Sequence, residues 1–276
     1  MKTINRLFST LAVMLLLFNY SIISAQEEAP KMPEYIAVTT MHWNMDKEDF
    51  KMDEWKAVEK EYLDKVTKKN EYILGASTYL HEFTPDNTEL IYVQTFASWD
   101  DMGKFADRNF ELAKEAWPDK EARQAFFDNR FSYYANEHSD EIYAPLKGAK
   151  LMAEAPTKDL LCYVRKVHFA FPEDGSQEEF NKMRLEYIEK VINKNEYIKA
   201  FYPHVHAWGS DRTEGLLAFF IESWADLDKM YDRNQELMKE AWPDEAERKA
   251  RGKAWSNYFT GVHEDYMYKW IHELSK

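Results

Sequence analysis

Histidines are the residues of this chain whose chemistry and spacing point most directly to a functional site. His204 and His206 stand two residues apart, and so do His263 and Asp265. Neutral imidazoles together with a carboxylate suit zinc, iron or copper. This pattern predicts a transition-metal or haem site at His204, His206, His263 and Asp265, although nothing in the sequence requires a cofactor.

The same residue types also suit chemistry without a metal. A histidine titrates near neutral pH and can act as a general base on an acidic C–H or O–H of a substrate. The candidates for this role are His81, His138, His206 and His263. A third interpretation is that histidines and tyrosines hydrogen-bond one another in a polar interior, so the sequence leaves open whether the protein is an enzyme.

The chain contains two copies of one unit. Residues 55–143 and 180–268 align without a gap, and 34 of the 89 aligned positions are identical. Each histidine of the first copy has a counterpart in the second: His42 with His168, His81 with His206, and His138 with His263. A duplication of this length predicts two domains of the same fold.

Each copy predicts the order strand, helix, two strands, one or two helices, strand. Residues 35–43 are rich in β-branched and aromatic side chains, and Trp55, Val58 and Tyr62 then recur at helical spacing. This order is the split βαβ unit of ferredoxin-like domains. Four antiparallel strands with helices on one face leave the other face uncovered. We therefore predict an α+β fold in which two ferredoxin-like βαββαβ repeats pack sheet to sheet as a pseudo-symmetric α/β barrel.

Strand alternation predicts which side chains line the barrel. Successive side chains of a strand point to opposite faces. Tyr79 shares a face with His81, and Tyr202 shares a face with His204 and His206. Tyr134, Asn136, His138 and Asp140 share a face of the fourth strand. Ligand-lining positions are therefore predicted at His42, Tyr79, Tyr134, His168 and Tyr202.

Two asparagines, Asn109 and Asn234, fall within the apolar stripe of a predicted helix. An unpaired amide there would be costly. A structural hydrogen bond is the favoured interpretation, and contact with a ligand is the alternative. Cys162, the only cysteine, falls in a strand-like run and is predicted to be a small buried side chain.

The order of elements and the strand chemistry of both repeats resemble the dimeric α/β-barrel superfamily, with the usual dimer fused into one chain. The chain is also similar to exported proteins of flavobacteria-like bacteria that carry no assigned activity. The superfamily includes cofactor-independent monooxygenases, isomerases, haem-binding enzymes and proteins without a known reaction. The resemblance therefore implies a barrel but does not select a function.

Residues 1–25 have the layout of a secretory signal peptide, with a basic start, an apolar run from Leu11 to Phe18, and Ala25 before the cleavage point. We expect an exported protein, periplasmic or secreted, with no membrane association after cleavage. The expected division of the rest of the chain is a linker at 26–34, a repeat at 35–145, a linker at 146–160 and a repeat at 161–276.

The formal net charge is −13, and loss of the signal peptide would bring it to about −15. Such a surface repels phosphate backbones, so nucleic acid is not an expected partner. The expected role is binding of a small, partly aromatic or hydrophobic molecule in a His/Tyr-lined cavity, by a monomer or weak homo-oligomer. An enzyme of the same fold and a structural protein without a cavity are the alternatives.

Overall fold

The computed structural model describes residues 32–276 except 171 and 174, so the predicted signal peptide lies outside the described residues. Residues 33–276 form one compact unit that contains both repeats. The first repeat consists of β1 (Tyr35–Trp43), α2 (Met52–Lys65), β2 (Gly75–Phe83), β3 (Glu89–Phe96), α3 (Trp99–Ala116), α4 (Lys120–Phe131) and β4 (Tyr134–Pro145). The second consists of β5 (Leu160–Phe169), α5 (Gln177–Lys190), β6 (Ala200–Trp208), β7 (Glu214–Ile221), α6 (Trp224–Ala241), α7 (Glu245–Ser256) and β8 (Phe259–Trp270).

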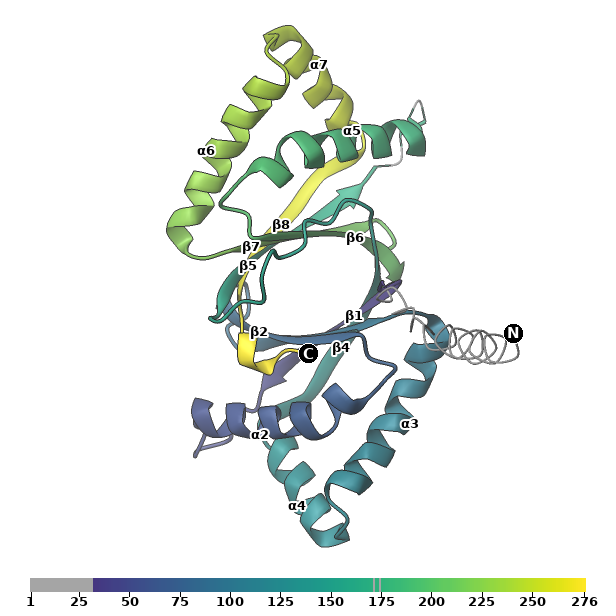
Figure 1. The fold of residues 1–276 in the computed structure, drawn as a ribbon, viewed down its shortest axis with the longest axis vertical. Helices are drawn as coiled ribbons and strands as arrows, with labels where there is room; N and C mark the ends of the chain where they lie inside the picture. The colour runs from purple at the N-terminus through teal and green to yellow at the C-terminus, as the bar shows by residue number, and fades with distance from the viewer. Residues whose placement is uncertain (1–31, 171, 174) are drawn as a thin grey trace, which may run out of the picture. The chain divides into compact units, whose positions relative to one another are not determined.

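The strands close into one barrel in the order β1-β3-β2-β8-β5-β7-β6-β4. The repeats meet at two antiparallel seams, β2 with β8 and β4 with β6. Figure 1 shows the ring of strands, with α2, α3 and α4 on one side and α5, α6 and α7 on the opposite side. The predicted fold class is confirmed. Because the strand order repeats after four strands, an approximate two-fold axis along the barrel relates the two repeats.

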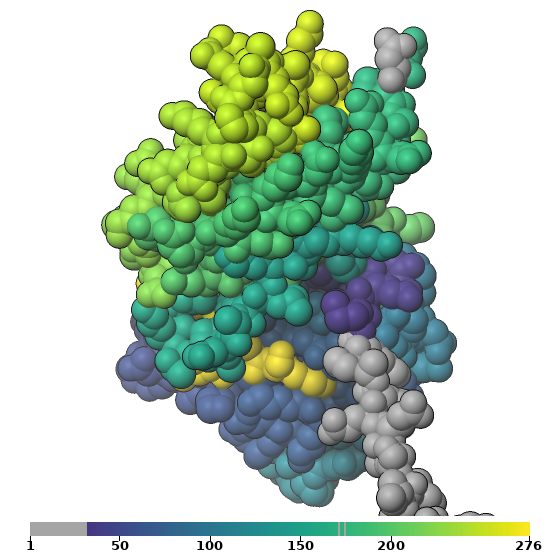
Figure 2. All heavy atoms as spheres, turned by 45° about the horizontal axis from the view of Figure 1, so that its top comes forward, coloured from purple at the N-terminus to yellow at the C-terminus, as the bar shows by residue number. Residues whose placement is uncertain are grey.

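Helices cover the outer face of the barrel, and local sequence signals set their boundaries. At the start of α3, an S-x-x-D capping signal is present, and the Ser98 side chain accepts a hydrogen bond from the Asp101 amide at 3.1 Å. Trp55 of α2 is fully buried beneath its helix. The space-filling view shows the green and yellow-green residues of the second repeat at the opposite end of the molecule from the blue residues of the first repeat (Figure 2).

The barrel interior is lined by alternate residues of the strands from both repeats. One apolar cluster joins them, and it includes Val38, Tyr79, Ile91, Cys162, Tyr202, Ala218, Phe220 and Trp270. Several of these side chains, among them Val38, Tyr79 and Ala218, remain partly exposed although strands surround them. The interior is therefore not completely filled by side chains.

The segment between β4 and β5 runs close to one part of this interior. Lys150 pairs with Phe201 of β6, and Met152 packs against the interior cluster. Among the residues that the structure describes, no helix has the length and apolar character needed to cross a membrane.

Candidate functional site inside the barrel

The barrel interior has two chemically different ends. At the first, which we call the acidic end, β1 and β5 finish and the hairpins β2–β3 and β6–β7 turn. At the second, the aromatic end, β5 begins and β8 finishes, and Phe220, Trp270 and Tyr202 lie together. A molecule lying along the barrel would therefore meet polar groups at one end and rings at the other.

At the acidic end of the first repeat, an aspartate holds a histidine. Asp86 Oδ2 lies 3.3 Å from His42 Nδ1, and Asp86 Oδ1 accepts hydrogen bonds from the Thr88 amide and hydroxyl at 2.8 and 2.7 Å. The hydrogen bonds from Thr88 and the nearby histidine keep the pKa of Asp86 below its usual value. When Nδ1 donates its hydrogen to Asp86, Nε2 of His42 is the basic nitrogen.

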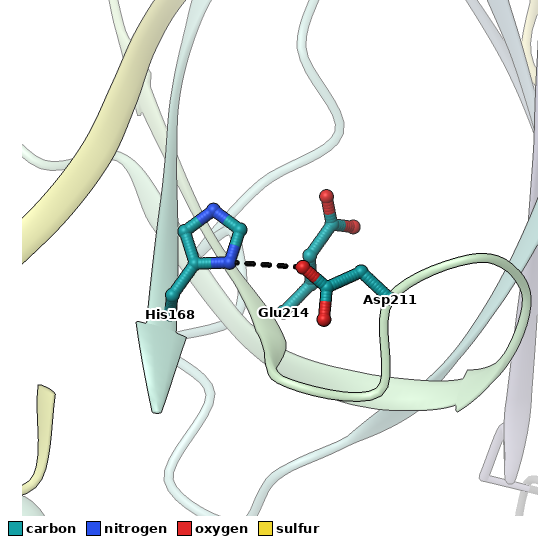
Figure 3. A group of neighbouring side chains, drawn as sticks. All are labelled: His168, Asp211 and Glu214. Carbon is teal, nitrogen blue, oxygen red and sulfur yellow. Dashed lines mark ion pairs between the residues drawn. The ribbon is translucent and has the colours of Figure 1, made fainter. Parts of the chain in front are cut away.

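The second repeat contains the same arrangement. Asp211 Oδ2 lies 3.2 Å from His168 Nδ1, and Asp211 Oδ1 is bound by the amide and hydroxyl of Thr213. Figure 3 shows His168 at the end of its strand, with Asp211 approaching from the hairpin and Glu214 beside them. The repeats differ at the other ring nitrogen, because His168 Nε2 lies 3.5 Å from Glu264 Oε2, whereas Ser139 occupies the position of Glu264 in the first repeat.

A glutamate next to each histidine is bound by the opposite repeat. Glu89 accepts a hydrogen bond from the hydroxyl of Tyr268 at 3.1 Å, and Glu214 accepts one from the hydroxyl of Tyr143 at 2.7 Å. Burial is the main cause that raises the pKa of both tyrosines, and the glutamates add to it. The tyrosines therefore stay neutral donors, and each half of the site is completed by the other repeat.

The second repeat also holds a lysine inside the barrel. Lys166 Nζ donates to Glu214 Oε1 at 3.1 Å, while Thr40 stands at its position in the first repeat. Potential ligand atoms of His168, Asp211 and Glu214 lie within 4.8 Å of one another, a separation that a metal ion could bridge. The oxygens of Asp211 and Glu214 already accept hydrogen bonds from Thr213, Lys166 and Tyr143, which would compete with a metal ion. This set therefore fits a hydrogen-bonded network better than a metal centre.

The side chains of β2 and β6 that were predicted to point into the barrel do so in the structure. Tyr79 and Tyr202 pack in the interior cluster, and His81 Nδ1 lies 2.8 Å from the hydroxyl of Thr84. Burial lowers the pKa of His204 to about 4, opposed only in part by a hydrogen bond with the Leu216 backbone. His204 is therefore a neutral imidazole at physiological pH.

Buried polar atoms without a partner gather in the interior. Among the described residues, four buried side-chain nitrogen or oxygen atoms have no hydrogen-bond partner, and three of them belong to inward-facing residues: His206 Nε2, Glu264 Oε2 and Trp270 Nε1. Trp270 is the most enclosed of the three, with 8% of its surface exposed. Such groups are rare in native proteins and call for an explanation.

The fourth strand of each repeat faces the other way from the prediction. His138 lies 3.5 Å from Asp140, and both side chains are more than half exposed. Asp140 accepts a hydrogen bond from Thr39, whose neighbour Val38 points inward. His138 therefore lies on the outer surface, and the interior positions of β4 belong instead to residues such as Tyr143.

The same correction applies to the second repeat. Asp265 is bound by Tyr163 and Arg165 on the outer face of the barrel, and His263 lies beside it at 3.3 Å. Since His204 and His206 face inward, the sheet separates them from His263 and Asp265. The structure does not bring the four predicted metal ligands together.

Tyr134 also lies outside the barrel. Its hydroxyl accepts a hydrogen bond from Trp55 Nε1 at 2.8 Å and donates one to Glu59 at 2.7 Å, both on α2. Arg130 forms two hydrogen bonds of 2.9 Å with the same glutamate. Tyr134 thus ties a helix to the sheet instead of lining the interior.

The asparagines in the apolar stripes make structural contacts. Asn109 accepts a hydrogen bond from Asn70 at 2.8 Å, and Asn234 accepts one from Asn195 at the same distance. Each bond joins a helix to the turn before a strand, outside the barrel. Cys162 is buried in the interior cluster, and burial raises the pKa of its thiol far above the usual range.

Sequence reasoning missed the acidic residues and the tyrosines that surround the histidines. Asp86, Thr88, Glu89 and Tyr143 are all identical in the second copy, as Asp211, Thr213, Glu214 and Tyr268. That identity was a usable signal, since His81 and His206 are the only other identical pair in the two hairpins. Nothing in the sequence alone, however, places a tyrosine of one repeat against a glutamate of the other.

The fold and site define a ferredoxin-like α/β barrel whose two halves share one interior. No protein-family model and no curated protein sequence matches the chain. Solved structures do match it. A proposed monooxygenase from Fusobacterium nucleatum shares 12% identity at a TM-score of 0.53, covering 87% of this chain and 93% of that one.

Two further matches have different names. An anthrone oxidase-like protein shares 10% identity at a TM-score of 0.50, over 90% of this chain and 94% of that one. A chlorite dismutase variant from Candidatus Nitrospira defluvii shares 11% identity at a TM-score of 0.51, over 90% and 97%. At these identities the likeness shows the fold and nothing of the chemistry.

Proposed function

We propose that the protein binds a small molecule with an aromatic or hydrophobic body inside the barrel. The observation that carries this proposal is that three buried, inward-facing polar atoms make no hydrogen bond: His206 Nε2, Glu264 Oε2 and Trp270 Nε1. We also propose, from the signal-peptide pattern, that the protein acts after export.

The energetics favour an occupant over a packed core. Leaving a buried donor or acceptor unsatisfied costs about 1–3 kcal/mol. A ligand that accepts the hydrogen of Trp270 would recover that cost. It would also cover the rings of Tyr79, Tyr202 and Phe220, which is favourable at about 25 cal/mol per Å² of apolar surface removed from water.

The test is binding of the neutral fluorescent probe N-phenyl-1-naphthylamine to the purified protein. Ala218→Phe adds a ring to the partly exposed interior cluster, and Ala125→Phe adds the same ring to the exposed side of α4. We expect the wild type and Ala125→Phe to bind one equivalent equally well. Ala218→Phe should bind at least about tenfold more weakly. Equal binding by both variants, at unchanged folded content, would show that the probe lies elsewhere and would overturn the proposal.

A second candidate function is acid–base catalysis on the bound molecule. The observation that favours it is the pair of aspartate-held histidines, His42 with Asp86 and His168 with Asp211. An aspartate that accepts the Nδ1 hydrogen orients the ring and leaves Nε2 to take a proton. Of the two, His42 is the better base, because Nε2 of His168 already faces Glu264.

Phenylacetone tests this candidate, because it combines an aromatic ring with an acidic C–H next to a carbonyl. In D2O, a general base would exchange the benzylic hydrogens for deuterium, which proton NMR follows as a loss of signal. We expect His42→Gln to slow the exchange, and the exposed outer-face variant His138→Gln to leave it unchanged. Exchange no faster than in buffer would remove catalysis of this type while leaving binding intact.

A further inference from the structure

The charge inside the barrel is concentrated at one end. Four inward-facing glutamates lie toward the acidic end: Glu89, Glu141, Glu214 and Glu264. The hairpin residues Asp86 and Asp211 add two carboxylates. Lys166 is the only lysine or arginine that faces inward from the eight strands that the structure describes. Six carboxylates therefore share the interior with one lysine and with the inward-facing rings of His42, His81, His168 and His206.

Two of these glutamates are incompletely bound. Glu214 uses both oxygens, toward Lys166 and Tyr143, and the carboxylate of Glu141 accepts from the amide and hydroxyl of Ser210. By contrast, Glu264 Oε2 accepts no hydrogen bond and has only the ring of His168 near it, at 3.5 Å, and Glu89 has a single bond at Oε1, from Tyr268. Their strands, β3 and β8, lie on either side of β2, and Glu264 stands four residues before Tyr268, the residue of β8 that binds Glu89. The acidic end therefore has spare acceptors for a cationic donor at two positions.

The opposite end has a spare donor among rings. Trp270 is nine-tenths buried, and its Nε1 has no acceptor. Its ring centroid lies 5.9 Å from that of Phe220, which in turn lies 5.8 Å from Tyr202 and 6.3 Å from Tyr79. An aromatic ring that carries an oxygen would fit this end, since the oxygen can accept the hydrogen of Trp270.

We propose that the barrel binds an aromatic amine, with its ring at the aromatic end and its positively charged nitrogen toward the spare carboxylates of the acidic end, Glu89 and Glu264. This inference rests on the proposed binding function and names the class of ligand. The long-range field supports it, since a net charge of −13 attracts cations to the protein.

Three probes that share a 4-hydroxyphenyl ring separate charge from shape: tyramine, which is cationic, tyrosol, which is neutral, and 3-(4-hydroxyphenyl)propanoate, which is anionic. Binding is measured by isothermal titration at low salt. We expect tyramine to bind at least about tenfold more tightly than tyrosol, and the anion to bind most weakly. Added salt should weaken tyramine more than tyrosol.

Variants test whether Glu89 and Glu264 cause the preference for the cationic probe. Glu89→Gln/Glu264→Gln should bring tyramine affinity close to that of tyrosol. The matched control Glu121→Gln/Glu189→Gln removes two carboxylates from exposed helix positions and should keep the preference. Ala218→Phe should weaken both probes together.

Each other outcome has a definite meaning. If tyrosol or the anion binds as tightly as tyramine and Ala218→Phe still weakens them, the binding function stands and the amine class is refuted. Tyramine binding that is insensitive to Ala218→Phe lies outside the barrel and also refutes the inference. If none of the three binds, the amine class is refuted, and the naphthylamine titration decides separately whether the barrel binds small molecules.

Discussion

Acidification should destabilise the protein through His204, whose ring faces the barrel interior from β6. Burial lowers the pKa of this imidazole from 6.5 to about 4, because the charged form loses its hydration there. In the unfolded chain the ring is solvated and has its ordinary pKa. The unfolded state therefore binds a proton that the folded state rejects at mildly acidic pH.

The sign and size of the effect follow from this difference. A histidine with a lowered pKa in the folded state contributes its full stability above pH 6.5 and loses it as the pH falls toward 4. For pKa values of 6.5 and about 4, the loss between pH 7.5 and 4.5 is about 2.5 kcal/mol of unfolding free energy. This is a large part of the total stability of an ordinary domain.

The assay is urea unfolding at pH 7.5, 6.5, 5.5 and 4.5 for the wild type and His204→Tyr. The first repeat has Tyr79 at the matching position, so tyrosine is compatible with this site in the fold. We expect the variant to lose about 2.5 kcal/mol less than the wild type over this range. His138→Gln, at an exposed histidine, serves as the control and should follow the wild type.

His204→Gln is a second variant without the imidazole, and it shows whether the result depends on how the tyrosine ring packs. Parallel stability curves for the wild type and both His204 variants would refute the reasoning, because they would mean that His204 is as easily protonated in the folded protein as in the unfolded chain.

Other predictions concern the outer layer and the thiol. Glu59→Ala should cost about 3–5 kcal/mol in urea unfolding, because it leaves Arg130 buried without its partner, and the double variant Glu59→Leu/Arg130→Leu should cost less. Asn234→Ala should cost about 1–3 kcal/mol by leaving the buried Asn195 amide short of an acceptor, and unchanged probe affinity would separate this role from ligand binding. Cys162 should react with Ellman's reagent only as fast as the protein unfolds, since burial raises its pKa; rapid labelling of the folded protein would contradict its position.

The fold was predictable because the repeat supplied the same pattern twice. Helical spacing around Trp55 and the capping signal at Ser98 and Asp101 each describe a local structure, and local structure depends on nearby residues. The closing of the barrel followed from an uncovered sheet face that a second copy could cover. These inferences need no knowledge of which strand edges meet.

The candidate site was predictable only in part, because facing depends on what covers a strand. Tyr79 alternates with apolar neighbours that pack under helices, so its inward direction could be inferred. In β4, polar side chains occur on both faces of the strand. Asp140 points outward, and Glu141 binds Ser210 in the turn between β6 and β7. Polarity alone cannot tell such faces apart, and His138 was placed on the wrong side for that reason.

The two seams of the barrel have a consequence for the origin and handling of this protein. A single repeat cut out of the chain would have two unpaired strand edges, β2 and β4 in the first repeat, and an open apolar face between them. Such edges recruit other strands and promote aggregation. Its glutamate Glu89 would also lose Tyr268. Joining both copies in one polypeptide supplies the missing partner at a fixed one-to-one ratio and lets the copies diverge, as Lys166 and Glu264 have done opposite Thr40 and Ser139.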